Sequence, residues 1–217
     1  MLSRRFPILT VAVAVTLYSA VLWAAKEFTP PHAENASTYP AKDAHPADKV
    51  TVAIDLYDSA PKNDIFITPY DQEGILPVFL IISNDGDHPI SLTNMRAQVV
   101  TENRAKLEAL AVEDVFRRVA HISGSTTPPP RLGPIPLSGN KNKKAQKQYL
   151  EIQNARFAAE AVEPHTTKAG FLFFDIAGVR NPVSGSHLYL TGVQDAGGTE
   201  LIYFDVPLIA SNAARSH

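Results

Sequence analysis

The sequence predicts a mainly β protein, an antiparallel β-sandwich, and three observations support this fold class. From position 49 onward, short apolar segments with a period of two alternate with turn residues, as half-buried strands do. The chain holds 17 prolines against 11 glycines, which favours strands and turns over a helical bundle. No cysteine is present, so stability must come from burial without disulfides.

The N-terminus predicts a membrane or signal helix. Arg4 and Arg5 precede an apolar run without charge, residues 6–25, and about 20 helical residues span the roughly 30 Å hydrocarbon layer. The run is longer than the roughly 7–15 apolar residues of a signal peptide, and Tyr18, Leu22 and Trp23 stand where cleavage requires small residues. An uncleaved single-span anchor and a cleaved signal peptide both stay open, with a buried helix of a soluble protein as a third alternative.

The positive-inside rule gives the orientation of this segment. The two arginines stay in the cytoplasm and direct the C-terminal part across the membrane. We therefore expect a bacterial cell membrane protein, single-pass, with its C-terminal domain periplasmic or extracellular. Without Arg4 and Arg5, 18 of the 20 basic residues remain against 22 acidic ones, and this balance argues against a nucleic-acid partner.

The composition along the chain predicts one domain behind a linker. Residues 27–48 hold four prolines and show no apolar periodicity, which is typical of a flexible linker. The remaining residues suffice for a single core. The predicted organisation is a signal-anchor or signal peptide at 1–26, a flexible linker at 27–48, a β-sandwich at 49–210 and a disordered tail at 211–217.

Strands are predicted on both sides of a helical insertion. The expected strands cover 50–56, 65–68, 75–83, 90–101, 157–162, 169–176, 187–193 and 201–209. Residues 75–83 form the most apolar stretch outside the N-terminus and predict a central strand. The polar turn 84–89 predicts a hairpin between that strand and 90–101, whose expected core contacts are Leu92, Met95, Val99 and Val100.

The insertion is predicted at about 107–159. Residues 107–121 carry apolar residues at helical spacing, and residues 146–159 do so approximately. Between them, residues 123–145 hold five prolines and then three lysines, which predicts a long exposed loop. Seven or eight strands with one helical and Pro-rich insertion are typical of an immunoglobulin-like sandwich.

Four positions in the last third support a resemblance to a known group. Val162, Pro164, Gly170 and Phe174 match a strand–turn–strand pattern, and the turn at Asn84 follows the central strand. In these features the chain resembles exported bacterial immunoglobulin-like domains of unknown function, over residues 50–100 and 157–209. The resemblance implies an extracytoplasmic β-sandwich and no functional residue.

Candidates for chemistry are few, and each has a plain structural alternative. Asp85, Asp87 and His88 share one tight turn, where clustered oxygens suit calcium, but hairpin turns select the same residue types. His165 and His187 are further candidates should they approach these side chains. Neither a nucleophile elbow nor a glycine-rich phosphate loop is present in the sequence, so we expect no enzyme, no metal and no cofactor.

One basic cluster is the tentative partner contact. It consists of Arg131, Lys141, Lys143, Lys144 and Lys147. Such a cluster is either a solvated loop or a surface for anionic lipid headgroups or an acidic partner. The sequence thus predicts a membrane-tethered, non-enzymatic interaction module of the cell envelope that binds another envelope protein. The alternative is a sandwich-based metal-binding protein or hydrolase with its site at the hairpin tips.

Overall fold

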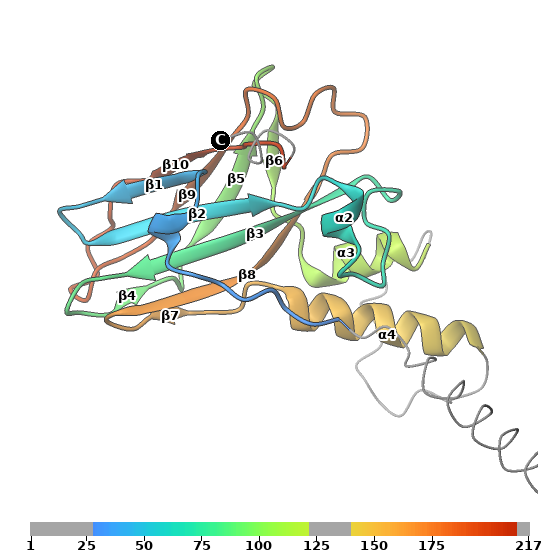
Figure 1. The fold of residues 1–217 in the computed structure, drawn as a ribbon, viewed down its shortest axis with the longest axis horizontal. Coiled ribbons are helices and arrows are strands. Elements are labelled where there is room, and N and C mark those ends of the chain that lie inside the picture. The colour runs from blue at the N-terminus through green and yellow to red at the C-terminus, as the bar shows by residue number, and fades with distance from the viewer. Residues whose placement is uncertain (1–27, 122–139, 212–217) are drawn as a thin grey trace, which may run out of the picture.

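Two four-stranded antiparallel sheets form the body of the protein (Figure 1). The computed structural model describes residues 28–121 and 140–211. The first sheet has the order β1 (Lys42–His45), β2 (Val50–Leu56), β3 (Ile75–Asn84) and β8 (Thr166–Asp175). The second sheet has the order β10 (Phe204–Pro207), β9 (His187–Thr191), β5 (Arg96–Val100) and β6 (Lys106–Glu108). A small pair joins β4 (Ile90–Ser91) to β7 (Ala161–Val162).

Three α-helices and one 3-10 helix complete the described elements. They are η2 (Ala36–Thr38), α2 (Ala60–Asn63), α3 (Val112–Val119) and α4 (Asn140–Ala155). Both α3 and α4 fall between β6 and β7, so the predicted helical insertion is present. Figure 1 shows the three α-helices gathered at one end of the sheets, away from the tip where β3 ends.

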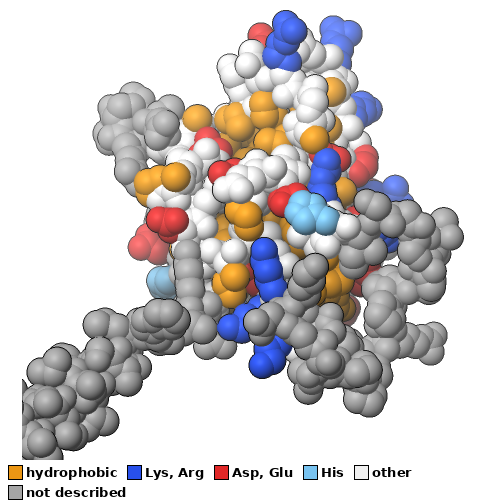
Figure 2. Space-filling model, turned by 90° about the vertical axis from the view of Figure 1, so that its right-hand side faces the viewer, with side chains coloured by type: hydrophobic (Ala, Val, Ile, Leu, Met, Phe, Trp, Pro, Cys, Tyr) orange, Lys and Arg blue, Asp and Glu red, His pale blue; other side chains and the backbone are white. Residues whose placement is uncertain are grey.

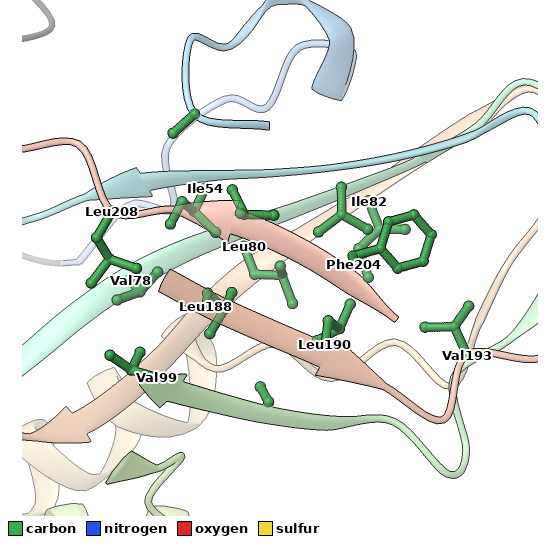
Figure 3. Close-up of a cluster of buried hydrophobic side chains, with 14 of the residues drawn as sticks. Ile54, Val78, Leu80, Ile82, Val99, Leu188, Leu190, Val193, Phe204 and Leu208 are labelled. Atoms are coloured by element: carbon green, nitrogen blue, oxygen red, sulfur yellow. The ribbon is translucent and has the colours of Figure 1, made fainter. Parts of the chain in front are cut away.

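The main core lies between the two sheets. Ile54, Leu80 and Ile82 point inward from the first sheet and meet Leu188 and Phe204 of the second, all at 1 % exposure or less (Figure 3). Full burial of one such side chain contributes about 1.5–3 kcal/mol. Successive residues of a strand point to opposite faces of the sheet, so the period-two apolar pattern in the sequence marks the residues that point into this core.

A second core covers the other face of the first sheet. Phe79 and Ile81 of β3 and Phe171 of β8 point away from the sandwich interior and pack against aromatic residues of the 57–70 connection and against Ile152 of α4. Every residue of β3 is therefore buried. This explains why residues 75–83 form an unbroken apolar run, as strands covered on both faces do.

The predicted flexible linker at 27–48 is wrong for its described part. Ala36 is fully buried and its N–H donates to Ser83 Oγ at 2.8 Å, while β1 pairs with β2 from Lys42 onward. The small residues and prolines that indicated a linker instead let this segment pack closely over the first sheet. The tail predicted from 211 also begins too early, because Ser211 is buried and its Oγ donates to the Leu56 carbonyl at 2.8 Å.

The predicted hairpin around residues 84–89 is also wrong. β3 pairs with β2 and β8, whereas β5 pairs with β6 and β9 in the other sheet, so this turn carries the chain from one sheet to the other. Asn84 holds the crossing by donating from Nδ2 to the carbonyls of His88 and Val162, at 2.8 and 3.1 Å. Local turn chemistry looks the same for a hairpin and for such a crossing.

Smaller differences concern element boundaries. Residues 65–68 form no strand, and the expected helix at 107–121 shortens to α3 because Lys106–Glu108 pairs with β5. The second helix starts earlier than expected, at Asn140. Val100 lies on the outer face of its sheet and is not a core contact.

Within residues 28–121 and 140–211, the structure contains no helix with the length and apolar character needed to cross a membrane. The predicted anchor or signal segment, residues 1–26, lies outside the described residues.

Candidate functional site

The outer face of the second sheet carries a row of exposed and half-buried polar and aromatic side chains. Strand alternation turns His187, Tyr189 and Thr191 of β9 outward, opposite the buried Leu188 and Leu190. The register completes this face, which we call the outer sheet face. Its further members are Arg96, Gln98 and Val100 of β5, Lys106 and Glu108 of β6, and Asp205 and Pro207 of β10.

Asp205 of the edge strand β10 contacts two side chains of the neighbouring strand β9. Its Oδ1 lies 2.6 Å from Nδ1 of His187, and its neighbour across the ladder is Tyr189. Partial burial raises the pKa of Tyr189, and the charge of Asp205 with a hydrogen bond to it raises that pKa further. The Tyr189 hydroxyl is therefore held in its neutral form.

Aromatic rings line one side of the same face. The ring of Tyr203 lies 5.8 Å from that of Tyr189, and His187 lies 6.4 Å from Tyr189 on the other side. Tyr203 is 54 % exposed and the adjacent Ile202 is 75 % exposed, the largest exposed fractions among the large apolar side chains of the described residues. Rings of this kind with a polar tip suit protein or ligand contacts, because they bury apolar area and still offer a hydrogen bond.

Two of the four edge strands, β10 and β8, are protected against pairing with a further strand. At β10, the Asp205 N–H donates to Asp43 Oδ2 at 2.8 Å, and Pro207, two residues on, has no N–H to offer. At β8, Leu110 donates to the Phe173 carbonyl and Phe157 to the Phe171 carbonyl, each at 2.8 Å. Proteins protect edges in this way against pairing with other strands. The face of the second sheet is thus a better contact surface than these edges.

A second polar group lies at the tip of the sandwich around Asp87. Lys49 Nζ and His165 Nε2 each approach its carboxylate at 3.2 Å. The hydrogen bond and charge of Lys49 lower the pKa of Asp87, with a smaller contribution from His165. All three side chains are more than half exposed, so these pairs are weak contributors to stability. Lys49 and Asp87 border a cleft of about 300 Å³ that His88 and Asp195 also line.

The candidates from the sequence are only partly brought together. Asp87 meets His165 as the sequence reasoning required, but Asp85 accepts from Asn35 Nδ2 at 3.0 Å instead. His187 lies on the outer sheet face with Asp205. In the part of the chain that the structure describes, no group of three or more His, Asp or Glu side chains is arranged to hold a metal ion.

The four lysines of the basic cluster lie on α4, although the sequence placed only Lys147 in a helix and the other three in the loop. Lys143, Lys144 and Lys147 are exposed on α4, and Lys141 also belongs to that helix, although its side chain lies outside the description. Arg131 lies outside the described residues. The four-residue and three-residue spacings to Lys147 place the three described lysines on one side of α4. The sequence signal for a loop came from the prolines before 137, and the lysines after it are good helix formers.

A shallow cavity lies where α3 and α4 meet β8. Its volume is about 400 Å³, and its lining combines apolar side chains such as Leu110 and Phe171 with the charged Glu113 and Arg156. Figure 2 shows apolar side chains exposed between charged ones at this end of the molecule. Nothing in its lining gathers groups for acid–base or nucleophilic chemistry.

Sequence reasoning missed the buried carboxylate of Glu151, which is 2 % exposed on α4. It accepts from the N–H of Ile67 and of Thr68, the latter at 3.1 Å, and from the Tyr70 hydroxyl at 3.2 Å. Burial, with the charge of Glu151, raises the pKa of Tyr70, so this hydroxyl remains a donor. Glu151 is the one acidic residue of a helix whose other residues are basic or neutral. This was the one feature of the sequence that could have indicated its special role.

Comparisons with known proteins give little further information. No family model matches the chain, and no curated protein matches it. Among solved structures, it is similar to a conserved hypothetical protein from Bacillus anthracis, with 12% identity over 75% of this chain and 91% of that one and a TM-score of 0.32. It is also similar to the secreted protein MPT63 from Mycobacterium tuberculosis, with 9% identity over 81% of this chain and 97% of that one and a TM-score of 0.31. Both TM-scores are below 0.5, so neither likeness carries an argument about function.

Proposed function

We propose that this protein is a membrane-tethered, extracytoplasmic interaction module that binds another envelope protein through the outer sheet face. The observation that carries the proposal is the asymmetry of the sandwich. The first sheet is covered on both faces, by the second sheet and by the helices, whereas the second sheet keeps Arg96, Thr191 and Tyr203 exposed on its outer side. A face that combines exposed aromatic rings with hydrogen-bonding groups has the composition of a protein contact surface.

The strand order supports an immunoglobulin-like assignment. In immunoglobulin sandwiches the B strand pairs with A and E, and the C, F and G strands form the opposing sheet. Here β3 pairs with β2 and β8, while β5, β9 and β10 follow one another in the second sheet with β6 beside β5. In this scheme β5 corresponds to strand C and β8 to strand E. The helices α3 and α4 lie between them, after β6 and before β7. Such sandwiches serve many unrelated functions, so the fold supports a binding role without selecting a ligand.

Export rests on the N-terminal sequence. Two arginines before the apolar run 6–25 support translocation of the domain, and the length of the run supports retention in the membrane. A C-terminal fusion to alkaline phosphatase, which is active only outside the cytoplasm, tests the orientation. An active fusion in the membrane fraction supports the proposal, and an inactive one contradicts it.

Site-specific photo-crosslinking in intact cells tests the binding face. A photoreactive residue at Thr191 on the outer sheet face should give a discrete adduct, and the double change Tyr189→Ser with Tyr203→Ser should abolish it. The matched control carries the probe at Ala196, an exposed position at the tip of the sandwich. Equal adducts from both positions, or none from Thr191, would overturn the choice of this face.

A further inference from the structure

The first described residue lies beside α4. The ring of Phe28 stacks on Phe66 with centroids 5.5 Å apart and planes 3° from parallel. The next residues of that connection, Ile67 and Thr68, donate their N–H groups to Glu151 of α4. Figure 1 shows the same arrangement, with the start of the described chain running alongside the yellow helix α4.

Very little chain separates this point from the predicted anchor. Only Lys26 and Glu27 lie between Phe28 and the end of the apolar run at Ala25. At about 3.8 Å between consecutive Cα atoms, Phe28 reaches no more than about 11 Å from Ala25. The headgroup layer on each side of a bilayer is itself roughly 5–8 Å thick. With the run in the membrane, the α4 end of the domain is therefore held at the membrane surface.

The charge on α4 fits that position. Lys143, Lys144 and Lys147 are exposed on one side of the helix, and Leu150, one turn further, is 50 % exposed. The only acidic residue of α4 is Glu151, which is buried and used by the 67–70 connection. The exposed side of the helix thus presents positive charge and one apolar side chain. Basic helices with exposed apolar residues are typical of segments that lie on membranes.

We infer that the exposed side of α4, with Lys143, Lys144, Lys147 and Leu150, binds the anionic lipid headgroups of the bilayer in which the protein is anchored. This inference rests on the proposed function only for the anchor. Each lysine within the Debye length of about 8 Å at physiological salt adds roughly fivefold to the affinity for an anionic surface. Contact with this surface orients the domain, and the outer sheet face and the tip around Asp87 stay available to other proteins.

Single-cysteine labelling of the full chain tests the inference, because the sequence contains no cysteine. Leu150→Cys carries an environment-sensitive fluorophore, and the full-length protein is reconstituted in two kinds of vesicle. One kind contains phosphatidylcholine alone, and in the other phosphatidylglycerol replaces part of it; both contain a lipid with a nitroxide quencher on its headgroup. The matched control is Ala196→Cys, exposed at the opposite end of the first sheet.

We expect strong quenching at position 150 in the phosphatidylglycerol vesicles, weak quenching in phosphatidylcholine alone, and weak quenching at position 196 in both. The triple change of Lys143, Lys144 and Lys147 to Gln should lower the equilibrium constant for the contact by about 100-fold, as three lysines at fivefold each imply. Vesicle-bound protein without quenching at 150, or with equal quenching in both lipids, would overturn the inference and leave the anchor intact. Protein that fails to stay with the vesicles would overturn the anchor, and this inference with it.

Discussion

The rings of Phe28 and Phe66 lie parallel, with centroids 5.5 Å apart, so Phe28 is part of the folded domain. Phe28 also meets Phe171 edge to face at 6.4 Å, so the segment before β1 is joined to the aromatic core on the first sheet. In the sequence, Phe28 stands three residues after Ala25, the last residue of the apolar run. With that run in a membrane, as we propose, the domain has almost no reach from it.

Removal of the Phe28 ring should destabilise the domain. Phe28→Ala loses the stacking on Phe66 and part of the apolar burial, and we expect a loss of about 1–2 kcal/mol in the free energy of unfolding. Urea denaturation followed by circular dichroism measures this change. The matched control, Leu150→Ala on the exposed side of α4, should change stability by less than about 0.5 kcal/mol. An unchanged midpoint for Phe28→Ala would show that the segment is not part of the core.

Glu151 should be among the most sensitive polar positions. Glu151→Ala leaves the buried N–H groups of Ile67 and Thr68 without an acceptor, and we expect a loss of about 2–4 kcal/mol. Gln146→Ala, an exposed change on the same helix, serves as the control and should be close to neutral. Hydrogen exchange at the amides of residues 67 and 68 should rise in the Glu151 variant. Slow exchange at both amides in that variant would contradict the assigned role.

Gly170 is required by a close approach between chain segments. A Cβ at this position would lie 2.5 Å from Cα of Phe157 and 2.9 Å from the Arg156 carbonyl oxygen. Gly170→Ala should therefore separate the segment after α4 from β8 and cost about 1–3 kcal/mol. The control is Gly197→Ala, where the nearest atom is Oδ1 of Asp195 at 3.2 Å. Equal midpoints for the two variants would contradict this packing.

The outer sheet face makes a prediction about ionisation. Because the Asp205 carboxylate adds to the raised pKa of Tyr189, Asp205→Asn should lower that pKa, while the contribution of burial remains. Nuclear magnetic resonance titration of the Tyr189 ring carbon, assigned with Tyr189→Phe, measures the change. A Tyr189 pKa that does not move would place its hydroxyl away from Asp205.

Acid sensitivity should depend in part on Asp175. Burial raises the pKa of Asp175, but hydrogen bonds from Arg118 and from the Ala177 N–H outweigh it, so the net pKa is lowered. A lowered folded-state pKa gives stability that is present above the unfolded value of about 3.9 and is lost as the pH falls through the folded value. Asp175 is 46 % exposed, so solvent screening limits the effect to less than about 1 kcal/mol.

The variant Asp175→Asn isolates this contribution. Its stability should lie below that of the unmodified protein at neutral pH, and the two should converge as the pH falls below about 4. Thermal unfolding at a series of pH values measures both curves. A constant difference between the curves at every pH would contradict the role of this carboxylate.

The sequence predicted well those strands that are buried on one face or on both faces. Residues 75–83 form most of β3, and residues 187–193 contain β9. Both were predictable because the spacing of apolar residues indicates whether one face or both faces of a strand are buried. The helical insertion followed from the same argument. The partners of the strands could not be read in this way, since the turn at Asn84 has the same residues whether it joins strands of one sheet or of two.

The candidate contact surfaces were harder to predict. Asp205 and His187 lie on two neighbouring strands, and the pairing of these strands brings their side chains to 2.6 Å. The sequence separation of the two residues does not indicate this contact. The segment from Phe28 to Thr38 reads as a linker because the contacts that bury it are with distant residues, such as Phe66 and Ser83. The lysines of α4 were recognised as a cluster. Because of the prolines before them, however, the sequence predicted a loop where the first turns of α4 lie.

The mass of the mature protein, measured on a washed membrane fraction, tests the central claim most directly. The account predicts an N-terminus at Met1 or Leu2 in that fraction, with the apolar run still attached and the domain held beside it through Phe28. A mature chain that starts near Ala25 and is found in the soluble fraction would contradict the anchor, and with it the position of the domain at the membrane surface.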